Sequence, residues 1–386
     1  MRVTNAATYR KYTTSVNNLH ARLNKNMNKI SSGKEYESAA ESPLSYYQSK
    51  KIDSQYQETL SKLNLIKDVS GRLEQQEDGV YDIQQLLKGA KNDMVLKGLT
   101  GTTSPTAMAT LRDDLVQKSQ MMVNDLNSQY QDFYVYGGND ATTPPFSLSS
   151  DASTLTYTHV FPGENTPTKF VMELKRDDAT GEYSYDLTEG DISKLVQAMS
   201  EQGYMDLGYG DIRDRDTLMD TYTGGMNVLT GMNSDAVKSQ YPKLPLDPAD
   251  EAAATEDIMK RLKDGPLGLV AQSVMAMNKY LDPADPLYDK RDVLQDDLER
   301  LVQDMTVGEH TVSTFYSDLG TKYHTLETTK DKLDLMSDSL KTQYANVAGA
   351  DPYQSIMEMF DSQYAYKAAL QLGSNLMSSS LFDFVR

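Results

Sequence analysis

The 386-residue chain has no cysteine and no tryptophan. Without cysteine it has no disulfide, no thiolate zinc ligand and no cysteine nucleophile. No run of apolar residues approaches the roughly 18 that a membrane-spanning helix needs. The N-terminal stretch MRVTNAATYRKY also lacks the apolar core of a secretory signal peptide. If the protein leaves the cell, it must use a route that does not depend on such a signal.

Apolar residues and positive charge are both in short supply. Hydrophobic residues make up 39% and charged residues 24% of the chain, against averages of roughly 45–50% and 25%. This composition suits elongated helices that bury one stripe better than a thick globular core. The net charge of −18 argues against nucleic acid as a general partner, because phosphate binding needs a cationic surface.

Residues 1–34 depart from this balance, with seven lysines and arginines and no acidic residue. Transit peptides share this basic, acid-poor composition. The helical pattern continues, however, without a break that resembles a cleavage site. We therefore favour a basic helix face that is solvated or meets acidic neighbours.

Heptad periodicity is the clearest structural signal. From Leu298 to Val347 every seventh residue is apolar, and a matching series runs from Ile52 to Met94 with one threonine in it. This repeat predicts long coiled-coil-like helices, which we place over 52–95, 105–136 and 290–347. The residues assigned to the core of this rod are Ile52, Ile66, Leu73, Val80, Leu298, Val312, Leu319, Leu326, Leu333 and Leu340.

Each end of the chain carries a shorter apolar stripe. The first ends at the stop signal Ser31-Ser32-Gly33, and the second begins after Asp351, which can cap a helix with Pro352 in its first turn. Large apolar residues at the free C-terminal end would be a solubility liability, so we expect the stripes to be buried against other segments. Their residues are Val16, Leu19, Leu23, Ile30, Ile356, Met359, Phe360, Leu370, Met377, Leu381 and Phe384.

The middle of the chain has a different pattern. Alternating apolar residues predict strands within 155–161, 170–174 and 183–187, and helices are predicted near 191–201 and 255–281. The chain leaves the rod at Gly137-Gly138, where glycine allows a sharp turn and Pro144 prevents the helix from resuming. We expect the three aromatics before this exit, Phe133, Tyr134 and Tyr136, to plug the end of the bundle.

The predicted fold is therefore mainly α with a β-containing insertion. A long antiparallel helical bundle or coiled coil comes from both termini, and a central α+β domain interrupts it. The expected segments are an N-terminal assembly segment, a rod arm, the central domain, a second rod arm and a C-terminal assembly helix. Their predicted bounds are 1–50, 51–139, 140–285, 286–350 and 351–386.

The sequence indicates no catalytic, cofactor or metal site. The four histidines share no metal-ligand spacing. The aspartates of GDIRDRDT, residues 210–217, lack the spacing, the glycine and the final glutamate of a calcium loop. Phosphate-loop and nucleophile-elbow motifs are absent as well. Because a carboxylate-based site needs no motif, an enzyme in the middle segment stays open as an alternative.

Four segments of the sequence, the first of which carries two motifs, together resemble the bacterial flagellin superfamily, closest to the hook–filament junction proteins of the FlgL type, the third hook-associated protein. Ile30-Ser31-Ser32-Gly33-Lys34 is similar to the family's Leu-Ser-Ser-Gly-Lys, and Glu41-Ser42-Pro43 to its Asp-Asp-Pro element. YVYGGNDATTPPF resembles its Tyr-hydrophobic-Phe-Gly-Gly…Thr-x-Pro-Phe signature. DTYTGGMNVL, residues 220–229, resembles a stretch late in the insertion, and SSSLFDFVR its Ser-Leu-Leu-Asp-aromatic ending. The match covers about 1–146 and 286–386.

The resemblance implies a structural junction subunit, not an enzyme, that adapts hook-side proteins to the flagellin filament by helical self-assembly of its terminal coiled-coil segments. It implies a homo-oligomeric ring, a FlgK-like hook-side neighbour, flagellin and a FlgN-like export chaperone as partners. It also implies an extracellular place in the flagellum, reached through the flagellar export channel. The alternative within the family is flagellin itself. A cytosolic coiled-coil scaffold would explain the heptads, but neither the apolar chain end nor the exit motif.

Overall fold

The computed structural model describes residues 2–99, 104–137, 143–164, 166–177, 179–207 and 218–382. Within these ranges, side chains are described for residues 7–374. By packing, the chain forms an end unit, Met1–Leu65 with Lys330–Arg386, and a middle unit, Ile66–Thr329. The five segments expected from the sequence stay a prediction, because they follow roles in an assembly and not packing within one chain.

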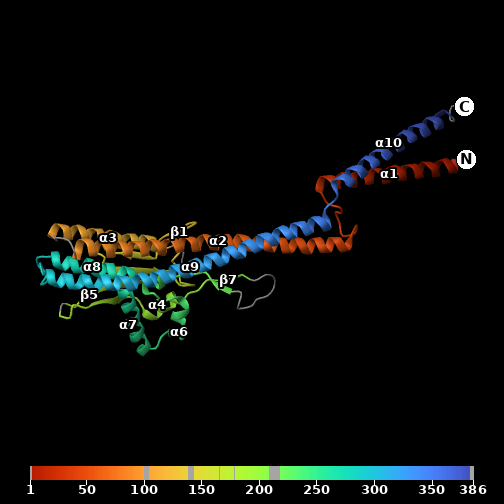
Figure 1. The fold of residues 1–386 in the computed structure, drawn as a ribbon. Coiled ribbons are helices and arrows are strands. Elements are labelled where there is room, and N and C mark those ends of the chain that lie inside the picture. Colours follow the sequence, from red (N-terminus) through yellow and green to blue (C-terminus); the bar gives the residue numbers. More distant parts are fainter. Residues whose placement is uncertain are drawn as a thin grey trace. The chain divides into compact units, whose positions relative to one another are not determined.

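Helices dominate the described chain (Figure 1). The long helices are α1 (Arg2–Ser32), α2 (Pro43–Asp93), α3 (Pro105–Leu126), α9 (Arg291–Ala348) and α10 (Pro352–Phe382). The shorter ones are the π-helical turn η1 (Met94–Leu99), α4 (Ile192–Met199), α5 (Gly225–Thr230), α6 (Ser234–Gln240), α7 (Pro248–Asp264) and α8 (Pro266–Leu281). The prediction of a mainly α chain with long helices from both termini is confirmed.

A four-stranded antiparallel sheet forms the β part of the middle unit. Its strands follow chain order as β3 (Phe146–Leu148), β4 (Thr154–His159), β5 (Thr168–Arg176) and β6 (Tyr183–Glu189). Two short ribbons pair β1 (Gln129–Tyr130) with β2 (Phe133–Tyr134), and β7 (Tyr204–Asp206) with β8 (Leu218–Asp220). Side chains alternate between buried and less buried along β4 and β5. The predicted β-containing insertion is confirmed, and the three predicted strands coincide with β4, β5 and β6.

The heptad residues lie in the interior of the paired helices α2 and α9. Of the ten residues assigned to the rod core, nine are buried and Ile52 is half-buried. The two helices run antiparallel. In the middle unit, Lys91 Nζ lies 2.6 Å from Glu309 Oε1, and in the end unit Lys341 Nζ lies 5.8 Å from the Tyr56 ring centre. The repeat in the sequence therefore marks the face along which these helices pack.

Helix α3 is shorter than the sequence pattern predicts. The prediction of a helix to Tyr136 is wrong, because α3 ends at Leu126 and the β1–β2 ribbon follows. At this point the side chain of Asn127 bonds both backbone groups of Phe146. Its Nδ2 donates to the carbonyl oxygen at 2.8 Å, and its Oδ1 accepts from the backbone N–H at 2.9 Å. This contact ties the end of the helix to the first strand of the sheet.

Tyr136 is fully buried against α2. Its hydroxyl donates to the carbonyl oxygen of Gln76 at 2.6 Å. A Cβ at Gly79 would lie 2.8 Å from the same hydroxyl oxygen, so the glycine makes room for the ring. Burial, with smaller effects of nearby aspartates, raises the pKa of Tyr136 well above its usual value. The hydroxyl therefore stays protonated and keeps its bond to the helix.

The other predicted plug and exit residues differ in their burial. Phe133 is exposed and Tyr134 is half-buried, so Tyr136 alone of the three aromatics is enclosed. Gly137 is buried and Pro144 is exposed, whereas Gly138 lies outside the described residues.

The prediction of a single helix near 255–281 is wrong in one respect. Two helices, α7 and α8, occupy this range, with Gly265 between them. Pro266 is the first residue of α8. A backbone N–H at this position would have no partner within the helix, so proline costs no helical hydrogen bond there.

Asp125, near the end of α3, is predicted to destabilise the fold at neutral pH. Burial and the like charge of Asp82 raise the pKa of Asp125 from 3.8 to about 6. The nearby cation, Lys118, is already bound to Asp93 and Asp114. The folded state therefore loses stability as pH rises from the unfolded pKa through the folded pKa. Because the carboxyl is partly exposed, we expect Asp125→Asn to raise the free energy of unfolding by only about 1 kcal/mol at pH 8.

Urea unfolding of both proteins at pH 4 and pH 8 measures this effect. The gain should largely disappear near pH 4, because the carboxyl is then protonated in the folded state and the pH is close to the unfolded pKa of 3.8. Asp113→Asn, on the exposed face of the same helix, is the control and should show no gain of this kind. A gain of equal size at both pH values would contradict the assignment.

Candidate assembly interface

The two ends of the chain pair with each other inside the end unit. Helices α1 and α10 lie side by side (Figure 1) and run antiparallel. The Tyr12 hydroxyl donates to the carbonyl oxygen of Ala369 at 3.0 Å. Further along, Asn26 Nδ2 donates to Ser362 Oγ and to the carbonyl oxygen of Glu358, both at 3.0 Å. These specific bonds fix the register of the pair, as a buried asparagine does in coiled coils.

The face that α10 turns toward α1 is built largely from small residues. Ser355 and Ser362 are buried, and Ala369 follows them at the same seven-residue spacing. Gly373 is also buried, and a side chain at that position would collide with the Tyr12 ring. We call this face the inner seam. Small side chains let the helices approach closely but bury little apolar surface, so the inner seam adds only modestly to stability.

The opposite face of α10 is apolar and exposed. Residues at spacings of four, three and four form it, and we call them the outer stripe: Tyr353, Met357, Phe360 and Tyr364. Their exposed fractions range from 49% to 83%. At 3.6 residues per turn they lie about half a turn around the helix from the inner seam. Such a stripe is typical of a helix that packs against a second partner.

Several residues that the sequence assigned to assembly are exposed in the chain. Ile30, Ile356, Phe360 and Leu370 are exposed, whereas Val16, Leu19, Leu23 and Met359 are half-buried. Met377 and Leu381 lie on α10, but their side chains are outside the described set, and Phe384 lies outside the described residues. Sequence reasoning missed the other members of the outer stripe. Their four-three-four spacing would have revealed them, had the pattern been followed on both faces of the helix.

The end unit has a thin core. Its described buried apolar residues are Tyr36, Leu333, Leu340 and Ala348. Backbone bonds close the connection between its long helices, with Glu35 N–H donating to Ala348 O at 2.9 Å. A helix pair with so few buried apolar side chains is marginal alone. We therefore expect fast amide hydrogen exchange in α1 and α10 of the free chain.

Part of the basic N-terminal segment is neutralised within the end unit. Lys29 Nζ lies 2.5 Å from Glu35 Oε1 and 3.7 Å from Glu358 Oε2. The hydrogen bond to Glu35 raises the pKa of Lys29, with further contributions from the charges of both carboxylates. Lys25 Nζ lies 3.0 Å from Glu41 Oε1. Two of the seven basic residues of this segment therefore form ion pairs with acidic neighbours.

The described ranges of the chain contain neither a cluster of metal-ligating side chains nor a membrane-spanning helix. There, no three histidine, aspartate or glutamate side chains group as they would around a metal ion. No described helix combines the length and the apolar character needed to cross a membrane. The calcium-loop candidate at 210–217 lies outside the described residues.

No protein-family model and no curated protein matches the sequence. A structure described as a flagellar hook-associated protein of Vibrio parahaemolyticus is 11% identical, with a TM-score of 0.49, over 80% of this chain and 100% of its own. Flagellar hook-associated protein-3 of Legionella pneumophila is 11% identical, with a TM-score of 0.32, over 79% and 98%. The flagellar junction protein FlgL of Legionella pneumophila is 12% identical, with a TM-score of 0.28, over 74% and 99%. All three descriptions name flagellar hook-associated or junction proteins.

Proposed function

We propose that this chain is a structural subunit of the bacterial flagellum that joins hook-side proteins to the flagellin filament. In this proposal, copies assemble into a helical ring through α1 and α10. The outer stripe is the observation that carries it. Four large apolar side chains in register on one helix face are left uncovered by the chain's own partner helix. A neighbouring copy that covers them completes the core that the end unit lacks.

The energetics support assembly through these helices. Burial of one large apolar side chain contributes roughly 1.5–3 kcal/mol, so the outer stripe alone can supply several kcal/mol per contact. Part of this gain offsets the ordering of marginally stable terminal helices. Repeated copies related by a screw axis make head-to-tail contacts, so the stripe need not meet the same stripe on its neighbour.

The partners and the location in this proposal follow from the motif resemblance. They are a FlgK-like protein on the hook side, flagellin on the filament side and a FlgN-like chaperone before export. The chain would reach the outside of the cell through the flagellar export channel without a cleaved signal. The middle unit would then face outward. Its role is structural in this proposal, not catalytic.

Deletion of the gene from the bacterium that encodes it tests the proposal. The expected result is hooks without filaments, with flagellin released into the medium. If the chain were flagellin, the deletion would also remove filaments, but the medium would then contain no flagellin. Normal filaments and motility after deletion would contradict both readings.

A further inference from the structure

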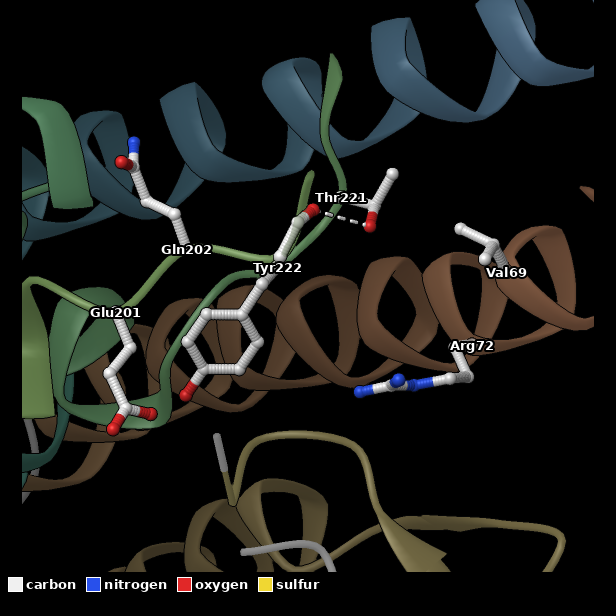
Figure 2. A pocket seen from close by; sticks show the side chains of 7 residues that line it. Val69, Arg72, Glu201, Gln202, Thr221 and Tyr222 are labelled. Atoms are coloured by element: carbon white, nitrogen blue, oxygen red, sulfur yellow. Dashed lines mark hydrogen bonds between the residues drawn. The ribbon is translucent and has the colours of Figure 1, made fainter. Parts of the chain in front are cut away.

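A small pocket lies in the middle unit beside the base of the β7–β8 ribbon (Figure 2). Its volume is about 100 Å³. Helix α2 contributes Val69 and Arg72, the segment that leads into β7 contributes 201–203, and the segment after β8 contributes Thr221 and Tyr222. Neither the terminal helices nor the proposed assembly contacts take part in it.

Arg72 brings an unused positive charge to this pocket. Its side chain extends from α2 toward the Tyr222 side (Figure 2). Within the described part of the chain, its guanidinium forms no hydrogen bond or ion pair. A guanidinium has five N–H donors and no acceptor, and it matches the two oxygens of a carboxylate. The guanidinium of Arg72 can therefore serve as the counter-ion of a ligand carboxylate in this pocket.

Glu201 brings a fixed negative charge to the other side of Tyr222. In Figure 2 the ring of Tyr222 lies between Glu201 and Arg72. Glu201 Oε1 is 3.0 Å from Nε2 of His159, a fully buried ring whose Nδ1 is 3.2 Å from the Tyr157 hydroxyl. The side chain of Glu201 is only 11% exposed. This chain of bonds holds the carboxylate in place.

The rest of the pocket wall is neutral and firmly held. The Thr221 hydroxyl donates to the carbonyl oxygen of Gly203 at 2.9 Å, and the Thr221 backbone N–H donates to the same oxygen at 2.8 Å. Burial raises the pKa of Tyr222 well above its usual value, with Tyr157 and Glu201 adding to the effect and Arg72 opposing it. Tyr222 therefore presents a neutral hydroxyl and an aromatic face between the two charges.

We propose that this pocket binds a small zwitterion of the α-amino acid class, with its carboxylate on Arg72 and its ammonium group toward Glu201. The volume is about that of three water molecules at roughly 30 Å³ each, which suits the smallest members of the class. The charge of Glu201 repels a multiply charged anion such as phosphate and attracts an ammonium group. The inference does not depend on assembly, since the pocket lies wholly in the middle unit.

Titration of the full-length, isotope-labelled chain with glycine tests the proposal by nuclear magnetic resonance. Glycine should shift the backbone amide signals of Gly203, Thr221 and Tyr222 in a saturable way. Arg72→Gln should weaken this binding by about tenfold or more, because the charge-assisted pair is lost. Lys67→Gln, an equal charge loss on an exposed position of the same helix, should leave it unchanged.

Glu201→Gln removes the negative charge and so tests its role apart from that of Arg72. Circular dichroism checks that each variant is folded. This variant should bind acetate at least as well as glycine, whereas the wild type should prefer glycine. No saturable shift with glycine, or equal binding of phosphate by the wild type, would overturn the proposal. So would self-association that depends on Arg72 while glycine fails to bind, since the carboxylate would then come from a second copy.

Discussion

Asp297→Ala is expected to lower the free energy of unfolding of the middle unit by about 3–5 kcal/mol. Asp297, on α9, accepts from Arg176 Nη2 at 3.0 Å and from the Tyr183 hydroxyl at 3.3 Å. The side chains of Arg176 and Asp297 are 4% and 11% exposed. Removal of the carboxylate leaves the guanidinium of Arg176 buried beside Tyr183 without its main counter-charge. The pair joins strand β5 of the sheet to a rod helix, so the sheet should detach first.

Urea unfolding, followed by circular dichroism, measures this loss. Asp186→Ala removes an exposed acid that pairs with Lys175 on the same sheet, and it should have no measurable effect. A double variant, Arg176→Met with Asp297→Leu, should recover part of the stability, because it leaves no unpaired buried charge. A loss below about 1 kcal/mol for Asp297→Ala would show that the guanidinium finds another partner or water.

Met357→Ser combined with Phe360→Ser is expected to weaken self-assembly by a factor of about 10² to 10⁴. Each of these outer-stripe side chains contributes roughly 1.5–3 kcal/mol when buried, and each 1.4 kcal/mol is about tenfold in affinity. Both side chains are exposed in the single chain. The free energy of unfolding of the free chain should therefore change little. Sedimentation velocity over a range of protein concentrations measures the assembly.

The matched control removes the same kind of surface from another helix face. Leu65 and Leu335 are exposed in the same unit but lie on α2 and α9. Leu65→Ser with Leu335→Ser should leave assembly within a few fold of the wild type. If this control weakens assembly as much as the α10 variant, general hydrophobicity drives association, and the outer stripe has no special role.

The paired helices of the rod could be predicted from the sequence because a heptad directly records which face is buried. Leu298, Leu319 and Val80 stand on that face. The end of α3 could not be predicted in this way. Asn127 stops the helix through bonds to Phe146, which lies 19 residues further along the chain, and no local window contains that partner.

Two other features depended on information that the sequence pattern does not carry. Gly79 stands in the middle of helix α2 for no local reason, and only the fold shows that the Tyr136 ring occupies the space. On α10, a pattern of large apolar residues overlooks Ser355 and Ser362, which form the inner seam. The inner seam uses side chains that hydrophobic periodicity ignores. Likewise, the pocket at Arg72 has no motif, because its walls come from separate parts of the chain.

The most direct test of the account is to identify what covers the outer stripe after assembly. A photo-crosslinking amino acid at Phe360 can be compared with one at Gln354, a polar exposed position about a third of a turn away around the same helix. Mixing isotopically light and heavy chains before assembly distinguishes crosslinks between copies from crosslinks within one. The account predicts that position 360 crosslinks mainly to the terminal helices of another copy, and only in assembled material. Crosslinks confined to the same chain, or none above those at position 354, would contradict it.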